Sequence, residues 1–378
     1  MFLDLTPWYL YRPDALAVWK SEDVKRRLWW YYRVMKSLKP AKFMIAKRVE
    51  VPENPTKLDY EGLWSLHDEV AKEFVRIFKD IESDKLSIDD LSKPDFSFLD
   101  LKIILVREML KACIFCERRC KVNRLKGEKG YFCRLDHRTY VHSWFHHLGE
   151  EAPLVPSGTI FYGSCNFKCV FCQNFDISQE NIYGGVLVTA KSLAIIQKEL
   201  RSKGARNINH VGGDPTPNLH TIVESLKYLD VNVPQLWNSN MYLTVEAMKI
   251  LVDIIDIWLP DFKYGNDKCA LRLSGVPKYF EVVTRNLKIA VKHGDMIIRH
   301  LVLPNHIECC TKPVLKWIAE NLPKNKVLVN IMEQYRPEYK VLREPGKWPD
   351  IARRPKYDEI SEAYSYAKKL GIVFEPVS

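Results

Sequence analysis

Short apolar runs alternate with helical patterns from about residue 155 to the end of the chain. Continuous apolar strands separated by helices predict a parallel sheet covered on both faces. Six such units predict a barrel-like α/β domain whose functional groups gather at the carboxyl ends of the strands. The expected strands are Gly158–Tyr162, Asn207–Val211, Val233–Trp237, Ile254–Leu259, Met296–Val302 and Lys326–Ile331, with Ile372–Val377 as a final strand. The expected helices are Ala190–Lys203, Leu219–Leu229, Val245–Val252, Phe280–Lys292, Pro313–Asn321 and Tyr357–Leu370.

The first hundred residues have a different pattern. Helical periods cover Asp23–Leu38, Tyr60–Lys79 and Asp100–Ala112, with proline-containing loops between them. We therefore predict an α-helical N-terminal region at 1–105, a four-cysteine module at 106–150 and the barrel at 151–378. Four consecutive aromatic residues, Trp29 to Tyr32, cannot share one helix face. We expect them to dock onto the barrel; the alternative is stacking on nucleobases beside neighbouring basic residues (Lys25, Arg26, Arg27 and Arg33).

Composition places the chain among ordinary globular proteins. Of its 378 residues, 47% are hydrophobic and 28% charged, which excludes a wholly disordered protein. We see neither an apolar run long enough to span a membrane nor a secretory signal in Met1–Pro13, so we expect no membrane partner and a cytoplasmic location. The net charge of +10 is concentrated in residues 1–50 and 111–134. These stretches are either anion-binding or ordinary solvated surface.

Seven of the ten cysteines form two tight groups, in which only two or three residues separate most neighbours. This spacing is typical of metal or cluster ligation, whereas disulfide frameworks belong to small secreted domains. The groups are Cys113, Cys116, Cys120 and Cys133, then Cys165, Cys169 and Cys172. The other three, Cys269, Cys309 and Cys310, match no spacing, and we expect them to be buried small hydrophobic residues.

The second group has the pattern C-x3-C-x2-C, with Phe171 directly before Cys172. A cubane [4Fe–4S] cluster ordinarily takes four thiolates, so three local ones leave one iron open for a small molecule. The alternative is a zinc knuckle that lacks its fourth ligand. The pattern resembles the signature of the radical S-adenosylmethionine (SAM) superfamily. It also follows an expected strand, as the cluster loop does in that superfamily.

Polar motifs follow the next strands in turn. Gly212-Gly213-Asp214-Pro215 resembles the superfamily turn that holds the amino group of SAM, and glycines allow backbone to approach a ligand closely. Asn238 ends another strand. Asp261 and Lys263, two residues apart, face one side and bind either a polar ligand or one another. In the fifth strand Arg299 and His300 alternate, so only one of them points into the barrel; we assign Arg299 to the cofactor site.

The segment from about Gly149 to Pro337, half of the chain, resembles one branch of this superfamily: the PflX-type homologues of the pyruvate formate-lyase activating enzyme. The matching motifs are Gly149-Glu150-Glu151, Ser157 to Phe161, Cys172-Gln173-Asn174, Asn207-Ile208-Asn209, Leu259 to Lys263, Arg299 to Pro304 and Gln334 to Pro337. The resemblance implies an incomplete (β/α)6 TIM-like barrel, a [4Fe–4S] cluster and SAM. It names no substrate, and residues 1–100 lie outside it.

The first cysteine group supplies four thiolates, enough to close a site completely. Such a site suits structural zinc or a second iron–sulfur cluster equally well. Six basic residues surround it and either offset its negative charge or contact an anionic partner: Arg118, Arg119, Lys121, Arg124, Lys126 and Lys129.

The resulting hypothesis is a radical SAM enzyme. Cys165, Cys169 and Cys172 hold the cluster, while Phe171, Gly212, Gly213, Asp214, Asn238, Asp261, Lys263 and Arg299 surround SAM. An electron donor reduces the cluster, SAM is cleaved, and the 5′-deoxyadenosyl radical abstracts hydrogen from an unidentified substrate, either a protein, as for a glycyl-radical activase, or RNA. The alternative is a non-catalytic, zinc-stabilised nucleic-acid-binding protein.

Overall fold

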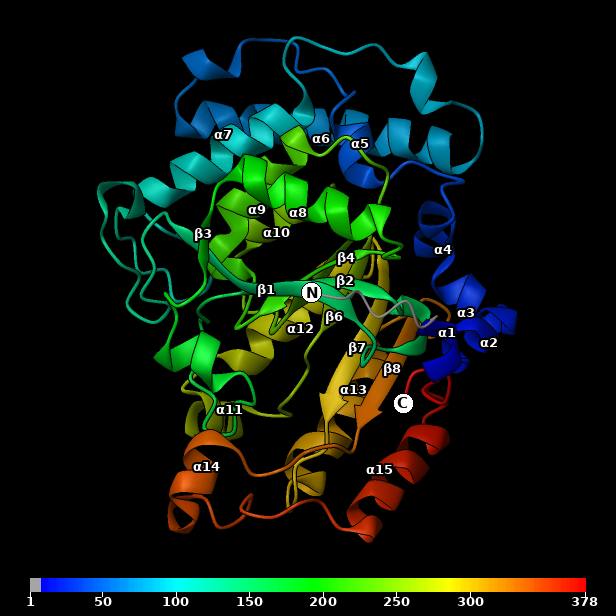
Figure 1. The fold of residues 1–378 in the computed structure, drawn as a ribbon, viewed down its shortest axis with the longest axis vertical. Helices are drawn as coiled ribbons and strands as arrows, with labels where there is room; N and C mark the ends of the chain where they lie inside the picture. The colour runs from blue at the N-terminus through cyan, green and yellow to red at the C-terminus, as the bar shows by residue number, and fades with distance from the viewer. Residues whose placement is uncertain (1–7) are drawn as a thin grey trace.

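The computed structural model describes residues 8–378, and its centre is one eight-stranded sheet in the order β3-β1-β2-β4-β5-β6-β7-β8 (Figure 1). Six strands are parallel: β2 (Ser157–Tyr162), β4 (Ile208–Gly212), β5 (Gln235–Ser239), β6 (Ile257–Pro260), β7 (Asp295–Leu301) and β8 (Val327–Met332). The sheet runs from β3 at one edge to β8 at the other, so these strands form an open, incomplete barrel. The predicted fold is confirmed.

Helices between the parallel strands cover the outer face of the sheet. They are α8 (Ala190–Ser202), α9 (Leu219–Tyr228), α10 (Val245–Leu251), α11 (Asp267–Ser274), α12 (Tyr279–Ala290) and α13 (Lys312–Asn321), followed by α14 (Tyr339–Arg343) and α15 (Tyr357–Lys369). Side-chain caps fix several starts: the oxygens of Thr189, Thr244 and Asn266 accept the N–H groups of Ser192, Ala247 and Cys269. The helix α11, which the sequence analysis missed, ends at Gly275 in the left-handed region.

Short helices and one long pair make up the N-terminal region. They are α1 (Trp8–Tyr11), α2 (Asp14–Ala17), α3 (Glu22–Arg27), α4 (Trp29–Met35), α5 (Lys42–Ala46), α6 (Tyr60–Glu82) and α7 (Phe98–Lys111). The predicted helix Asp23–Leu38 is broken at Leu28, whose φ of −114° and ψ of 39° are not helical. The pair α6 and α7 pack together, and α7 packs on α9.

The aromatic run docks onto the barrel, as we expected. Tyr31 is fully buried, and its hydroxyl donates to the Pro153 carbonyl at 3.3 Å. Trp30 is 4% exposed, and its Nε1 donates to Asp256 at 2.8 Å. The alternative, a base-stacking platform, is therefore not supported by these two residues.

The edges of the sheet differ from the prediction. The strands β1 (Thr139–His147) and β3 (Val186–Val188) were missed; β1 pairs antiparallel with both β2 and β3. The predicted strand Ile372–Val377 is wrong: it follows Gly371, whose φ is +67°, and contains Pro376, which has no N–H for a ladder. Only the Val373 carbonyl meets β8 through the backbone, accepting from Val329.

Among the described residues, no helix is both long and apolar enough to cross a membrane. The first seven residues of Met1–Pro13, where we see no secretory signal, lie outside the described part of the chain. The division into 1–105, 106–150 and 151–378 stays a prediction.

Candidate active site

The carboxyl ends of the parallel strands surround a cavity of about 230 Å³. In Figure 1 the arrowheads of β7 and β8 mark this end, which points away from α5, α6 and α7. Every residue that we assigned to the cluster and to SAM lines the cavity: Cys165, Cys169, Phe171, Cys172, Gly212, Gly213, Asp214, Asn238, Asp261, Lys263 and Arg299. Gln173, Asn174, Gln334 and Tyr335, which we noted only as family motifs, line it too.

The three-cysteine loop follows β2 directly. Hydroxyl and amide groups surround its sulfurs: Ser274 Oγ lies 3.0 Å from Cys169 Sγ, and the Phe167 N–H donates to Cys165 Sγ at 3.3 Å. Burial and, to a smaller extent, the neighbouring Cys172 raise the pKa of Cys169, while Lys263 lowers it, and the net value is about 11. A thiolate in this wall is therefore unfavourable unless a cation balances it.

Gly212 and Gly213 lie where the backbone leaves no room for a side chain. Gly212 has a φ of +121°, and a Cβ on Gly213 would lie 1.9 Å from the Ser164 carbonyl oxygen, next to the first cysteine. Asp214 is buried, and its two carboxylate oxygens accept the N–H groups of Thr216 and Asn240, each at 2.9 Å. Burial raises the pKa of Asp214. Its carboxylate therefore organises the backbone of the cavity wall.

Three other polar residues face the cavity, and they differ in whether their side chains have partners. Asp261 and Lys263 pair with one another at 2.5 Å, the second of the two outcomes that we left open. Asn238 is 4% exposed, and its side-chain Nδ2 has no partner among the described residues. A buried amide donor without a partner costs free energy unless a ligand accepts from it.

Arg299 points into the barrel and His300 points out, as the alternation requires. His300 is fully buried between the Phe262 carbonyl and the Thr311 hydroxyl. Arg299 pairs with Glu150 and Glu151, the latter at 2.7 Å. These partners were not predicted, although the two adjacent acidic residues before β2 belong to the family motif.

The four-cysteine module packs against the cysteine loop. A Cβ on Gly130 would lie 2.6 Å from Cys133 Sγ and 3.7 Å from Cys120 Sγ, so the chain brings these sulfurs side by side. Arg118 donates to the carbonyls of Asn166 and Gly275 at 3.2 and 2.7 Å. Arg124 is buried and donates to the Asp136 and Pro217 carbonyls. Two of the six surrounding basic residues, Arg118 and Arg124, therefore bind backbone carbonyls of this chain.

The remaining cysteines form a third group. Cys269 and Cys310 are buried, as we predicted, and Cys309 is half-buried. All three lie close to His306. This group was missed, although His306 stands three residues before Cys309 in the sequence.

The cavity fits a cluster with an open iron and a polar ligand. It presents three thiols from one loop, an unpartnered amide at Asn238 and a glycine cradle that a Cβ would obstruct. Three thiolates leave one corner of a cubane cluster unligated by protein.

Comparisons with known proteins agree with this chemistry. The Radical SAM superfamily matches residues 159–318. The uncharacterized protein MJ0674 of Methanocaldococcus jannaschii is 45% identical over 349 residues, covering 90% of this chain and 97% of the relative.

Solved structures give weaker likenesses. Streptococcus suis SuiB is 16% identical with a TM-score of 0.39, covering 56% of this chain and 46% of SuiB. A radical SAM methyltransferase from Sphaerobacter thermophilus is 13% identical with a TM-score of 0.41, covering 58% of this chain and 65% of that chain. The chain therefore spans less than two thirds of either protein. Similarity this low supports no conclusion about substrate. The sequence matches, however, are sufficient: the chain belongs to the family of MJ0674 and carries a domain of the Radical SAM superfamily.

Proposed function

We propose that the cavity at the carboxyl ends of the strands is the active site of a radical SAM enzyme, in which Cys165, Cys169 and Cys172 hold a [4Fe–4S] cluster beside SAM. The superfamily implies both groups. One observation carries the assignment of residues: eleven positions chosen from sequence motifs line a single cavity. When bound, the two groups supply one-electron cleavage of the SAM carbon–sulfur bond for hydrogen abstraction from a substrate.

The polar residues of the cavity position the cofactor. Asn238 offers an amide donor to a carboxylate or hydroxyl oxygen of SAM. The Gly212-Gly213 backbone forms a wall that approaches the ligand closely, and Asp214 keeps that wall in place through Thr216 and Asn240. Lys263 offers positive charge to the three thiolates, partly balanced by Asp261.

Apolar side chains line part of the same cavity. The rings of Phe171 and Tyr335 pack edge to face with their centres 5.7 Å apart. The Tyr335 hydroxyl donates a hydrogen bond to the Ile351 carbonyl at 2.7 Å. Leu301 and Met332 extend this wall. A dry cavity strengthens the polar contacts inside it and protects a reactive radical from stray donors.

The ion cluster at Arg299 closes the barrel interior. Burial raises the pKa of Glu150, but Arg299 and His147 lower it more, so that it lies at about 2. Asn209 and Asn330 donate to Glu150 and Glu151 at 2.9 and 2.7 Å. Each of these buried charges therefore has partners. Arg299 also lines the cavity, where it would help to position the cofactor.

The zinc-stabilised nucleic-acid-binding protein is not favoured, because it leaves the radical SAM domain without a role. Membership of the PflX-type branch and an activase-like reaction stay part of the proposal. The two substrate classes, protein and RNA, differ in how binding responds to salt: RNA binding weakens steeply as salt rises.

The decisive test is SAM cleavage by anaerobically reconstituted protein reduced with dithionite. We expect 5′-deoxyadenosine from the wild type and none above background from Cys169→Ala. The matched control is Val170→Ala, which changes the same loop but removes no sulfur, and which should bind iron and cleave SAM. Cleavage by Cys169→Ala at the wild-type rate would refute the assignment.

A further inference from the structure

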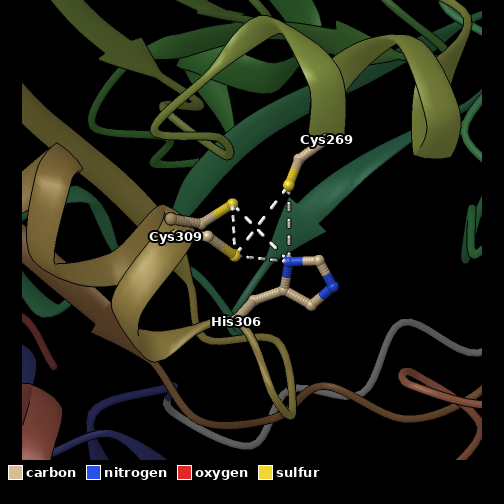
Figure 2. Close-up of side chains that lie close together, drawn as sticks. Cys269, His306 and Cys309 are labelled. Atoms are coloured by element: carbon tan, nitrogen blue, oxygen red, sulfur yellow. Dashed lines mark hydrogen bonds between the residues drawn. The ribbon is translucent and has the colours of Figure 1, made fainter.

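The third cysteine group has the composition of a metal site. Cys269 comes from α11, while His306, Cys309 and Cys310 come from the turn between β7 and α13. The three sulfurs and the His306 ring nitrogen all lie within 4.8 Å of one another. Figure 2 shows the side chains of Cys269, His306 and Cys309 converging on one point from two segments.

Five of the six spacings among these four atoms are close to the edges of one tetrahedron, and the sixth, between the sulfurs of Cys269 and Cys310, is within 4.8 Å. Zinc binds sulfur at about 2.3 Å and nitrogen at about 2.0 Å, which gives edges of about 3.8 Å between sulfurs and about 3.5 Å between sulfur and nitrogen. The Cys309 sulfur lies 3.9 Å from the sulfurs of both Cys269 and Cys310. His306 Nδ1 lies 3.7, 3.2 and 3.6 Å from the sulfurs of Cys269, Cys309 and Cys310.

A second layer of contacts orients the histidine for this role. Its other nitrogen, Nε2, lies 2.9 Å from Asp350 Oδ2. Donation to this carboxylate leaves Nδ1 with a free lone pair that faces the sulfurs, as in the carboxylate–histidine–zinc arrangement. Asp350 is held by Arg272. Asn266 Nδ2 donates to Cys269 Sγ at 3.4 Å and to the Cys309 carbonyl at 2.7 Å, which joins the two segments.

We propose that Cys269, His306, Cys309 and Cys310 form a closed tetrahedral zinc site. Four protein ligands leave no position for water or substrate, so the site is structural. A cubane cluster does not fit, because its ligands attach to different irons and lie farther apart than the edges of one tetrahedron. The site is separate from the cavity and does not depend on the proposed function.

The location of the site gives it a mechanical role. The last residues of α11 hold the cluster loop: the Ser274 carbonyl accepts from Lys168, the Leu273 carbonyl accepts from Val170, and Ser274 Oγ contacts Cys169. Zinc at Cys269 fastens the first turn of that helix to the turn after β7. The zinc therefore stabilises, through α11, the position of the loop that carries Cys165, Cys169 and Cys172.

Metal analysis of the anaerobically purified full-length protein tests the site. We expect Cys269→Ser/Cys309→Ser to hold one zinc fewer than the wild type. The matched control, Cys113→Ser/Cys116→Ser, makes the same chemical change at the other four-ligand group. In this variant Cys309 should stay protected from alkylation, which shows that the zinc beside it is kept. Zinc content unchanged in the first variant, or loss of iron in place of zinc, overturns the proposal.

A second measurement needs no variant at the ligands. In the wild type, alkylation mapped by mass spectrometry should spare Cys309, although it is half-buried, until a zinc chelator is added. The variant Asp350→Asn should lose zinc to the chelator about 10–100-fold more readily. Rapid alkylation of Cys309 without chelator overturns the site, whereas failed SAM cleavage with zinc retained counts only against the proposed function.

Discussion

The two ends of the barrel are built from the same strands but differ in what surrounds their buried carboxylate and amide groups. At the amino ends, Asp256 accepts from Trp30 Nε1, from the Lys42 N–H and from the Gln235 N–H at 2.8 to 3.0 Å. Asp295 accepts the Tyr31 N–H at 2.7 Å. The N-terminal helices therefore cover this end and provide partners for its buried carboxylates.

At the carboxyl ends, the cavity leaves groups without partners. Asn238 Nδ2 and the nearby Asn166 Nδ2 have none among the described residues, and three thiols share one wall. Under the proposed function, the polar groups at the amino ends stabilise the fold and those around the cavity bind ligands, although both are buried. Substitutions at the amino ends should change folding stability, whereas those at the carboxyl ends should change cofactor binding.

The largest effect is expected at Asp256. In Asp256→Ala three buried N–H donors lose their acceptor, so the free energy of unfolding should fall by about 3–5 kcal/mol. Urea unfolding of the cluster-free full-length protein measures it. Asp230→Ala, at an exposed ion pair with Lys198, should change stability by less than about 1 kcal/mol. Equal losses in the two variants would break the comparison.

The pH dependence of stability tests the amino ends of the strands further. Burial raises the pKa of Asp295 to about 7, against about 3.9 in an unfolded chain, so the folded protein holds a proton that the unfolded chain releases. The resulting stabilisation is fully present below about pH 4 and is lost as pH rises through 7.

Relative to Asp295→Asn, the wild type should therefore lose up to about 1.4 kcal/mol of unfolding free energy for each pH unit between about pH 4 and 7. Chemical unfolding at several pH values provides the measurement. Parallel curves for wild type and variant would show that this carboxyl ionises normally.

At the opposite end, Gly213→Ala tests the cradle. The added Cβ would lie 1.9 Å from the Ser164 carbonyl, and Ser164 must shift together with the adjacent Cys165. We expect a loss of about 1–3 kcal/mol in unfolding free energy. Because Cys165, a proposed ligand of the cluster, moves, iron bound after reconstitution should also fall. Gly346→Ala, with no atom within 4 Å of its Cβ, is the control; normal iron content in Gly213→Ala would argue against the close approach.

The strands and the cavity could be predicted because both follow local patterns. Buried parallel strands such as Ile257–Pro260 have continuous apolar runs, and residues just after them meet at one end of a barrel. The placement of Asp214, Asn238 and Lys263 in one cavity could therefore be predicted without knowledge of side-chain contacts.

The parts that were missed depend on packing between distant segments. The pairing of Arg299 with Glu150 and Glu151 joins residues about 150 positions apart. The third cysteine group depends on how α11 packs beside the turn after β7, and Cys269 has no cysteine neighbour in sequence. The strand β1 lies beside the edge strand β3 and mixes polar with apolar residues in no regular order, so it has no continuous apolar run.

The smallest expected change is at Asn238, where the comparison is most direct. Its amide donor is buried without a partner in residues 8–378, so Asn238→Ala should leave the free energy of unfolding unchanged within about 0.5 kcal/mol or raise it slightly. If that donor binds SAM, the dissociation constant should increase about tenfold, equivalent to about 1.4 kcal/mol. Calorimetric titration of reconstituted protein measures it, with Asn321→Ala, whose amide donates within α13, as the control. Unchanged affinity together with lost stability would place Asn238 with the structural groups of the other end, and the distinction between the two ends would fail at this residue.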